Sequence, residues 1–405
     1  MTTESPAAKV IAGVDTHADT HHVAVVDAAT GGVLGDKKFP TGRAGYAALL
    51  AFVCTFGQVV RFGVEGTNSY GAGLSRYLRA AGHTVAEVVR PNRAERRLRG
   101  KSDPLDAITA ARTAMSPDRL PTPKTSDGAV EAIRVLLTTR QSAVKARTAA
   151  MQQICSILVS APDDLRQQHE PLPAKTRLER LRRLRPGTDP ADVHAVTSRC
   201  LKQLATRCGD LDREIDTIDT SLRQVIGDHA PALLAAKGVG VVTAATLLVT
   251  AGDNPERITS DAAFAAVCGV SPIPASSGKT TRHRLNRGGD RQANWAIHQI
   301  ALVRMSSDHR TRTYIDKKRA EGKSTKEAMR CLKRAICREA YRLLTNPPEI
   351  PRIDDLRPLR QARGITLTTA AGHFGIWPAT ISTLERGLRR NDDLANTYRE
   401  WLQTA

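Results

Sequence analysis

Four carboxylates in the first quarter of the 405-residue chain are spaced for metal chemistry. Asp15 and Glu65 each close a short apolar run, and Asp103 and Asp106 stand three residues apart at the start of an expected helix. Residues three apart share a helix face, and acids at strand ends can meet at one edge of a sheet. Such oxygen ligands suit Mg²⁺ or Mn²⁺, and a pair of these ions can hold the attacking and leaving oxygens of a phosphodiester. The spacing therefore indicates a metal-dependent phosphodiester site.

Each acid also has an ordinary structural interpretation. An acid at a strand end is commonly a solvated turn residue, and Asp103 before Pro104 is a good helix N-cap. His17, His21 and His22 crowd Asp15, and we interpret them as structural or phosphate-facing rather than as metal ligands. Spacing alone leaves the metal site and these alternatives open.

A serine in a small, glycine-flanked loop is the second candidate for chemistry. Ser277 lies in the segment 269–279, directly before Gly278. Such a loop lets a ligand approach the backbone closely, and a serine there can attack a phosphodiester if a base or metal activates its hydroxyl. The cations that surround it, and that are expected to contact phosphates, are Lys279, Arg282, Arg284, Arg287 and Arg291. A plain turn serine is the alternative.

A Gly-x-Gly turn, Gly238 to Gly240, separates two expected helices. Backbone N–H groups at the start of the second helix, together with the helix dipole, favour a phosphate. The turn looks like a helix-hairpin-helix that binds a DNA backbone, although an ordinary tight turn has the same pattern.

The C-terminal segment has its own pattern. Leu367, Ala371 and Phe374 fall on one helical face, Gly375 makes a turn, and a second helix is expected from Pro378. This resembles a Cro/repressor-type helix-turn-helix, in which Thr380 and Ser382 would reach base edges. A helical tail that binds a partner is the alternative.

The elements that must position the acids predict an α/β domain with a mixed sheet, in the order of an RNase H-like fold. Strands are expected at 10–15, 22–27, 33–39, 59–64 and 84–89, and helices at 46–56, 70–81 and 103–115. A basic stretch between the last strand and the last helix is expected to bind nucleic acid; its cations are Arg93, Arg96, Arg97 and Lys101.

The rest of the chain is expected to be all-α. Prolines at 117, 121 and 123 indicate a linker, and two long helices, 129–159 and 191–226, flank a proline-rich basic interruption at 162–190. They suggest an antiparallel coiled arm, with a simple helical spacer as the alternative. The expected domains are an RuvC-like domain, an arm, a helical serine domain and a helix-turn-helix domain, at 9–116, 127–229, 230–345 and 354–405.

Composition favours a polyanionic partner. Sixty Lys and Arg against 41 Asp and Glu give a net charge of +19 and a pI near 10.0, and nucleic acid is the simplest partner of so basic a chain. Aromatic residues make up only 4%, which favours backbone and groove contacts over stacking on single strands. The seven cysteines form no CxxC pair, which argues against zinc. No apolar run suits a membrane helix, and we expect a bacterial cytoplasmic, nucleoid-associated protein with no membrane partner.

Taken together, these residues resemble the DEDD-type insertion-sequence transposases of family one-ten, which pair a RuvC-like domain with a serine-bearing transposase domain. The resemblance extends over residues 9–345, and its motifs are Gly13–Asp15, Val64–Tyr70, Lys101–Ala107, Gly238–Gly240 and Gly269–Gly278. It implies that the four acids bind Mg²⁺ or Mn²⁺ and that Ser277 forms a covalent link to DNA. It also implies double-stranded donor and target DNA, a noncoding bridge RNA as guide, and a homo-oligomer in which the metal domain of one subunit meets the serine domain of another.

Two other functions remain open at this point. A Holliday-junction-type endonuclease would use the same acids with water as the nucleophile and would not need Ser277. A non-enzymatic transcriptional regulator would use only the helix-turn-helix. Metal-dependent cleavage and a covalent serine–DNA intermediate distinguish the three.

Overall fold

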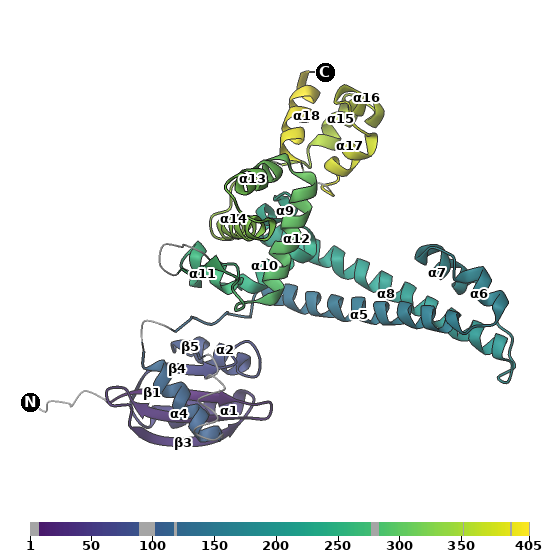
Figure 1. Ribbon diagram of the computed structural model, residues 1–405. Coiled ribbons are helices and arrows are strands. Elements are labelled where there is room, and N and C mark those ends of the chain that lie inside the picture. The colour runs from purple at the N-terminus through teal and green to yellow at the C-terminus, as the bar shows by residue number, and fades with distance from the viewer. Residues whose placement is uncertain are drawn as a thin grey trace, which may run out of the picture. The chain divides into compact units, whose positions relative to one another are not determined.

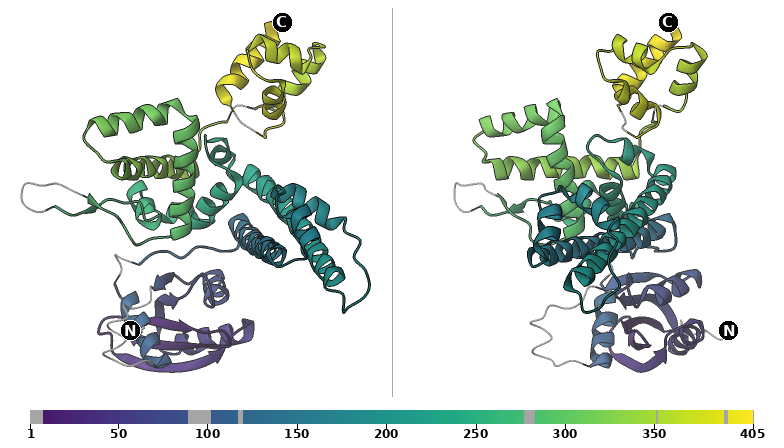
Figure 2. Two further views of the ribbon diagram at one scale, coloured as in Figure 1. Left: turned by 45° about the vertical axis from the view of Figure 1, so that its right-hand side comes forward. Right: turned by 90° about the vertical axis from the view of Figure 1, so that its right-hand side faces the viewer.

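The structure is a computed structural model that describes residues 8–88, 102–116, 120–276, 283–350, 352–388 and 391–404 (Figures 1 and 2). Its contacts divide the chain into two compact units, residues 1–131 with 251–259, and residues 132–250 with 260–405. Each unit is described by itself. The expected division into four domains stays a prediction.

A five-stranded mixed sheet forms the centre of the first unit, in the order β3-β2-β1-β4-β5. The strands are β1 (Lys9–Thr16), β2 (Thr20–Asp27), β3 (Val33–Pro40), β4 (Gln58–Glu65) and β5 (Val85–Val88). β1 to β3 form an antiparallel meander, whereas β4 and β5 run parallel to β1. Order and direction are consistent with the expected RNase H-like fold.

Helices cover both faces of this sheet. On one face, α1 (Arg43–Cys54) and α2 (Ala72–Ala80) bury Leu49 and Leu74 against the alternate strand residues Val14 and Val23. On the other face, α4 (Asp103–Ala114) packs Ala111 and Ala114 on Ile11 and Val26. β1 and β2 are buried on both faces, which explains their nearly continuous apolar sequences.

Two glycines allow α4 to approach the sheet closely. A Cβ on Gly13 would lie 2.0 Å from the Ala111 backbone N, and a Cβ on Gly63 would lie 2.8 Å from the Ala110 carbonyl O. Because neither strand carries a side chain at this point, the helix backbone rests directly on β1 and β4. This contact fixes where the start of α4 lies relative to the ends of those strands.

The expected linker after α4 is held against the same unit. The Glu87 N–H donates to the Pro121 carbonyl, and Arg79 donates to the Thr125 carbonyl. Asn254 also binds this segment: its side chain accepts a hydrogen bond from the Thr125 N–H and donates one to the Pro123 carbonyl. Prolines here mark an extended segment without helix or strand, but the segment from 120 onward is part of the packed unit.

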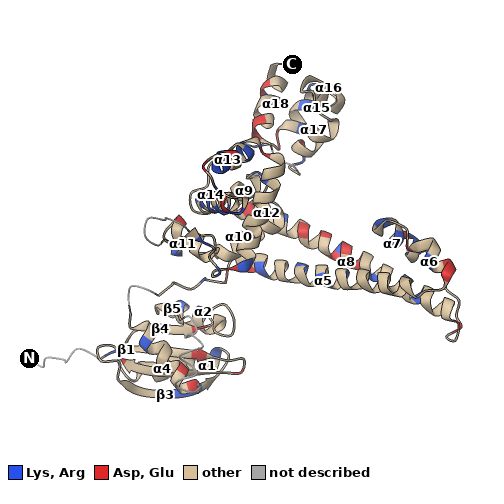
Figure 3. Cartoon of the chain, viewed as in Figure 1, with Lys and Arg blue, Asp and Glu red and all other residues tan. Residues whose placement is uncertain are grey.

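The arm of the second unit is antiparallel, as expected. It consists of α5 (Ala129–Val159) and α8 (Val193–His229). Arg140 pairs with Asp219 and Arg147 with Asp212, so residues later in α5 meet residues earlier in α8. Figure 3 shows acidic residues, coloured red, along α8.

The prediction of a loop-like interruption at 162–190 is wrong in part. It contains α6 (Asp163–His169) and α7 (Ala174–Arg182), each with a proline at its N-cap. Leu178 and Leu181 of α7 are buried between Leu158 of α5 and Leu201 of α8. The prolines therefore begin helices here, because proline is tolerated at a helix start.

The following block is largely helical, with one small hairpin. Its helices are α9 (Pro231–Ala235), α10 (Val241–Ala251), α11 (Asp261–Val267), α12 (Arg291–Ser307), α13 (His309–Ala320) and α14 (Thr325–Thr345). The short 3₁₀ helix Pro255–Arg257 belongs to the first unit. The hairpin pairs β6 (Ile273–Pro274) with β7 (His283–Arg284), which the sequence did not predict.

Four helices form the C-terminal part: α15 (Leu356–Ala362), α16 (Leu367–His373), α17 (Pro378–Glu385) and α18 (Asp392–Thr404). Ala371, Ile381 and Leu384 are buried in one core, with Phe374 packed against it. Gly375, at φ +62°, makes the turn between α16 and α17. The predicted apolar faces, turn and second-helix start agree with these positions. None of the helices in the described segments is long and apolar enough to cross a membrane.

Candidate active site

Asp15 and Glu65 lie at the same edge of the sheet. β1 and β4 are parallel and pair Val14 with Val64, so the next residue of each strand is one of the two acids. Gly13 and Gly63, two residues earlier, face α4, and the alternation of a strand places the acids on that face too. Both are nearly buried, at 6% and 5% exposure.

Asp103 joins Asp15 from the start of α4. One side-chain ligand atom each of Asp15, His17 and Asp103 lie within 4.8 Å of one another. The His17 Nε2 is 3.1 Å from the Asp15 Oδ2 and 3.5 Å from the Asp103 Oδ1. Residues from a strand, its following turn and a distant helix thus converge on one point.

Lys38 of β3 adds a positive charge beside this cluster. Its Nζ donates to the Asp103 Oδ2 at 3.3 Å. Burial tends to raise the pKa of Asp103, but the Lys38 ammonium and the neighbouring His17 outweigh it and hold this pKa below its ordinary value. Asp103 is therefore ionised at neutral pH and available as an oxygen ligand. A cavity of about 420 Å³, lined in part by His17, Lys38, Tyr70 and Asp103, opens over it.

The other two predicted acids lie outside the tight group. Glu65 and Asp106 are not among the described acids and histidines within 4.8 Å of each other at this point. Asp106 follows Asp103 by one turn of α4, and the Glu65 carbonyl accepts a hydrogen bond from Thr16. Ser102, not Asp103, is the N-cap of α4, so the capping alternative for Asp103 does not hold.

The three histidines separate by position. His17 lies among the acids, and its interpretation as structural or phosphate-facing stays a prediction. His21 is fully buried on the opposite face and stacks on Tyr46, and burial lowers its pKa. His22 binds Asp36 at 2.6 Å. The position of His17 beside Asp15 could have been predicted from its spacing of two residues along the chain. The position of Lys38 could not, because it depends on the register between β2 and β3.

The donor set fits a divalent cation. Two carboxylates and one imidazole nitrogen within 4.8 Å offer oxygen ligands with an optional nitrogen, which suits Mg²⁺ or Mn²⁺. His17 and Lys38 contact these same carboxylates, so a bound cation takes over their charge-balancing role.

The predicted nucleophile, Ser277, lies outside the described residues, as do Lys279 and Arg282. What the structure describes is the base of its loop, where β6 and β7 pair on either side. Asn294 of α12 donates to the Cys268 and Gly269 carbonyls at 3.2 and 2.8 Å, and Lys333 binds the Asn294 Oδ1. These bonds anchor the loop to α12 and α14.

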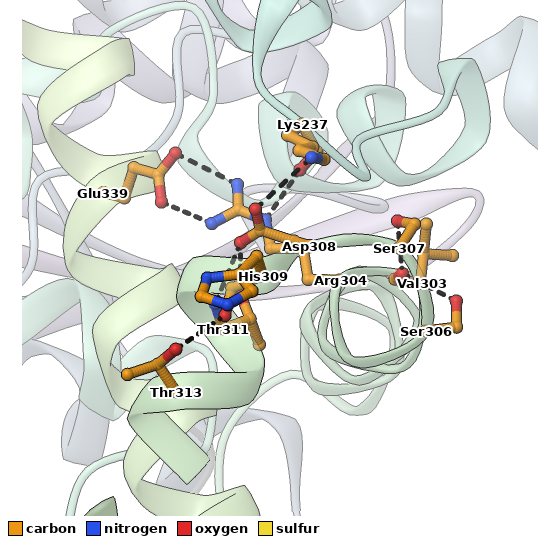
Figure 4. A network of polar contacts seen from close by, with 10 residues as sticks. All are labelled: Lys237, Val303, Arg304, Ser306, Ser307, Asp308, His309, Thr311, Thr313 and Glu339. Atoms are coloured by element: carbon orange, nitrogen blue, oxygen red, sulfur yellow. Dashed lines mark hydrogen bonds and ion pairs between the residues drawn. The ribbon is translucent and has the colours of Figure 1, made fainter. Parts of the chain in front are cut away.

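The Gly238–Gly240 turn is held by a polar network (Figure 4). Arg304 of α12 donates to the Lys237 carbonyl at 2.6 Å and makes a two-bond pair with Glu339 of α14, at 2.6 and 3.0 Å. Lys237 in turn pairs with Asp308, which caps α13. Within the turn, Val239 donates to the Ala236 carbonyl and Gly240 to the Thr243 hydroxyl. The expected phosphate donors are those at the start of α10, and their role stays a prediction.

Exposed cations surround the described part of the loop. Arg284, Arg287 and Arg291 are all exposed, as predicted for residues that meet phosphates. The other predicted cations, Arg93, Arg96, Arg97 and Lys101, lie outside the described residues. Helix α13 carries a further set that the sequence analysis missed, and Figure 3 shows its basic character. Its exposed cations are Arg310, Arg312, Lys317 and Arg319.

Comparison with known proteins gives two family matches. Residues 12–161 match the DEDD family of IS110 described as "Transposase", and residues 230–316 match the "Transposase IS116/IS110/IS902 family". A protein of insertion element IS900 from Mycobacterium paratuberculosis is 28% identical over 80% of this chain and 93% of its own length. A protein of insertion element IS110 from Streptomyces coelicolor is 33% identical, but over only 36% of this chain and 35% of its own length. The mini-circle putative transposase for IS117, from the same organism, is 27% identical over 67% and 78% of the two chains.

The family matches identify the chain as a DNA transposase, and the match of its sheet domain is to the DEDD class. The chain belongs to the IS110 family of insertion-sequence transposases. The DEDD family implies dependence on a divalent metal.

Proposed function

We propose that this transposase cuts and rejoins DNA strands at the acidic edge of its sheet domain, with Asp15, Glu65, Asp103 and Asp106 as metal ligands. The observation that carries the proposal is the convergence of Asp15 and Asp103, from opposite ends of the domain's sequence, within 4.8 Å of each other and of His17. Bringing such carboxylates together is costly unless positive charge balances them. Glu65, at the same edge, and Asp106, one turn along α4, would complete the set.

The metal ions would supply positive charge to the scissile phosphate and lower the pKa of the attacking hydroxyl. The chain's own residues set the geometry. Contact between α4 and Gly13 holds Asp103 against Asp15. Lys38, 3.3 Å from Asp103, is placed to bind a phosphate oxygen once the carboxylate binds a cation.

The second part of the proposal is that Ser277 is the nucleophile. Its hydroxyl oxygen would attack the phosphorus, lose its proton to a base, and form a serine–phosphate ester while the DNA strand leaves with a 3′-hydroxyl. A 3′-hydroxyl from another strand would then attack this ester and free the serine, so no external energy is needed. Arg284, Arg287 and Arg291 would neutralise the phosphate charge around the loop.

Resemblance to the family supports the partners proposed here. They are double-stranded donor and target DNA, a noncoding bridge RNA as guide, and further copies of this chain in a dimer or tetramer. Gly238 and Gly240 would hold the turn that brings the start of α10 to a DNA backbone. With two N–H groups of the turn already bonded, the first turn of α10 would provide the donors.

The C-terminal helices would add sequence recognition. Helices α16 and α17 flank the turn at Gly375, and we propose that they act as a helix-turn-helix with Thr380 and Ser382 near base edges. The element's ends or its promoter are the candidate sites. Deletion of residues 353–405 should weaken binding to that DNA; unchanged DNA binding and unchanged promoter activity would remove this part of the proposal.

The test of the catalytic proposal combines purified protein, guide RNA and labelled duplex DNA with Mg²⁺. Wild type should form a covalent protein–DNA adduct, Ser277→Ala should form none, and Asp15→Asn should neither cleave nor form adducts. Cleavage by Ser277→Ala without an adduct would instead identify a water-dependent endonuclease. Cleavage by Asp15→Asn equal to wild type would overturn the metal site, and absence of cleavage by wild type would favour a regulator.

A further inference from the structure

Trp377 is the most exposed of the large hydrophobic side chains in the described segments. It has 81% of its surface exposed, whereas the next of this group, Val193, has 68%. Trp377 lies between Gly375, which makes the turn after α16, and Pro378, the first residue of α17. This exposure leaves the apolar surface of the indole in water, and contact with a partner would remove it from water.

The other aromatic rings of the C-terminal helices are packed together. Phe374 lies edge-on to Tyr398 and Trp401, and His373 stacks on Trp401 with ring centres 4.6 Å apart. No ring or cation in the described part of the chain stacks on Trp377. This core is therefore complete without it, and Trp377 does not stabilise the fold through ring contacts.

Trp377 also occupies a helix N-cap, a position where tryptophan stabilises the helix less than a serine, threonine, aspartate or asparagine does. It is the N-cap of α17 and makes no side-chain cap hydrogen bond. Neighbouring helices use the preferred types: the Thr366 hydroxyl accepts from the Thr369 N–H to cap α16, and the Asn391 side chain accepts from the Leu394 N–H at the start of α18. A serine or aspartate at 377 would stabilise the helix better, so tryptophan here serves something other than folding.

The surroundings of Trp377 suit duplex DNA. Between Gly364 and Leu388 the only acidic residue is Glu385, and it is buried in a pair with Arg360 at 2.7 Å. No exposed carboxylate therefore repels a phosphate on α16 or α17, and Arg386 is exposed near the end of α17. The surface around the exposed ring is uncharged or basic. Such a surface does not repel the phosphates of a DNA groove, whereas it offers no carboxylate to a basic protein.

We infer that Trp377 is a specificity-determining contact of this transposase, whose indole packs on the 5-methyl group of a thymine in the major groove of duplex DNA. The thymine methyl is the apolar feature that the major groove offers, and cytosine lacks it. The inference rests on the proposed helix-turn-helix function, because it places the start of α17 in the groove. Beyond the proposed function, the inference names the recognised base, thymine, and the chemical group that Trp377 contacts, the 5-methyl group.

The experiment first finds the site. A random 20-base-pair duplex library is selected on the full-length protein in 150 mM salt and, in parallel, on Thr380→Asp/Ser382→Asp, whose acidic α17 would be repelled by DNA. Wild type should enrich a motif that the acidic variant does not. An identical motif from both proteins, or none from wild type, would overturn the helix-turn-helix proposal itself.

The second step tests Trp377 alone. Each thymine of the motif is replaced in turn by deoxyuridine, which removes only the methyl group. At one position the wild-type Kd should rise about fourfold, the worth of one buried methyl group. Trp377→Ser should bind the thymine and deoxyuridine duplexes equally, and Trp377→Phe should keep part of the difference. A motif with no deoxyuridine effect, or an effect that persists in Trp377→Ser, would overturn the inference and leave the helix-turn-helix proposal standing.

Two controls exclude a folding effect. Trp377→Ser should raise the hydrogen-exchange protection of α17, because it restores a cap while it weakens DNA binding. Thr366→Ala should lower the protection of α16 and keep the deoxyuridine effect. Lower protection of α17 in Trp377→Ser would mean that the tryptophan stabilises the fold, and the inference would fail.

Discussion

Gly13 of β1 and Ala111 of α4 are in backbone contact, so close that a Cβ on Gly13 would lie 2.0 Å from the Ala111 N and 2.2 Å from the Ala107 carbonyl O. This contact determines the distance from Asp15, two residues along β1, to Asp103 at the start of α4. The proposed catalytic geometry therefore depends on a residue that has no side chain.

Gly13→Ala should therefore damage both stability and activity. Backbone atoms cannot yield as a flexible side chain does, so α4 must move, at a cost of about 3 kcal/mol or more in the free energy of unfolding. DNA cleavage should fall even at temperatures where the variant is folded, because Asp103 moves with the helix. Chemical denaturation and the cleavage assay measure the two effects. Gly227→Ala is the matched control, since nothing lies within 4 Å of its Cβ position in α8; equal losses in both variants would contradict the argument.

The network at the Gly238 turn gives a second prediction. Arg304→Met should cost about 2–3 kcal/mol in stability, because the Glu339 carboxylate and the Lys237 carbonyl lose their charged partner. The stability of Arg304→Lys should lie between those of wild type and Arg304→Met, because lysine keeps the positive charge but cannot make the two-bond pair with Glu339. Duplex DNA affinity should decline in the same order. Arg213→Met removes a surface arginine whose ion pair, among the described residues, is with Asp210 of the same helix. The stability of this variant should stay within about 0.5 kcal/mol of wild type.

His169 of α6, which lies within the expected arm region 127–229, should make that region sensitive to mild acid. Its ring is 4% exposed, and burial, followed by the charges of Arg180 and Arg177, lowers its pKa. The folded region thus keeps a neutral ring while the unfolded chain takes up a proton below about pH 6.5. Because the unfolded state binds more protons, stability falls as pH drops through 6.5, by at most about 1.4 kcal/mol per pH unit for one group. Thermal unfolding at pH 7.5 and 5.5 should show this loss, His169→Leu should reduce it, and an unchanged pH dependence in that variant would contradict the assignment.

Much of the sheet domain could be predicted because its signals are local. Strands β1 and β2 carry the apolar runs 10–14 and 23–26, and β4 ends in Glu65, so their bounds follow from the sequence to within a few residues. The starts of α4 and α5 follow from Asp103-Pro104 and from a long regular apolar pattern. What the pattern could not give was register, and Lys38 reaches Asp103 only because β3 pairs with β2 in one particular alignment.

The errors have physical causes as well. Prolines at 162 and 173 suggested loops, yet they begin α6 and α7, whose Leu178 and Leu181 become visible as core only against two other helices. Spacing also could not tell which of the three histidines lies beside Asp15 and Asp103, because the turn after β1 brings His17 back to them. The sequence predicted phosphate-binding N–H groups at the start of the helix after the turn, but it could not show that, within the turn, the Gly240 N–H donates to the Thr243 hydroxyl.

The exposed cations of α13 give the last prediction. Arg310, Arg312 and Lys317 are exposed and, in the part of the chain that is described, belong to no ion pair, so a phosphate backbone can use all three. Replacing them together by glutamine should weaken duplex DNA binding and flatten its dependence on salt, by about 0.9 in slope for each phosphate that is no longer neutralised and about 2.7 in all. Glutamine at the exposed Lys175, Arg180 and Arg183, in and directly after α7, removes the same charge elsewhere and should change the slope by less than about 0.9. An equal decrease in both triple variants would show that net charge, rather than the α13 surface, governs binding.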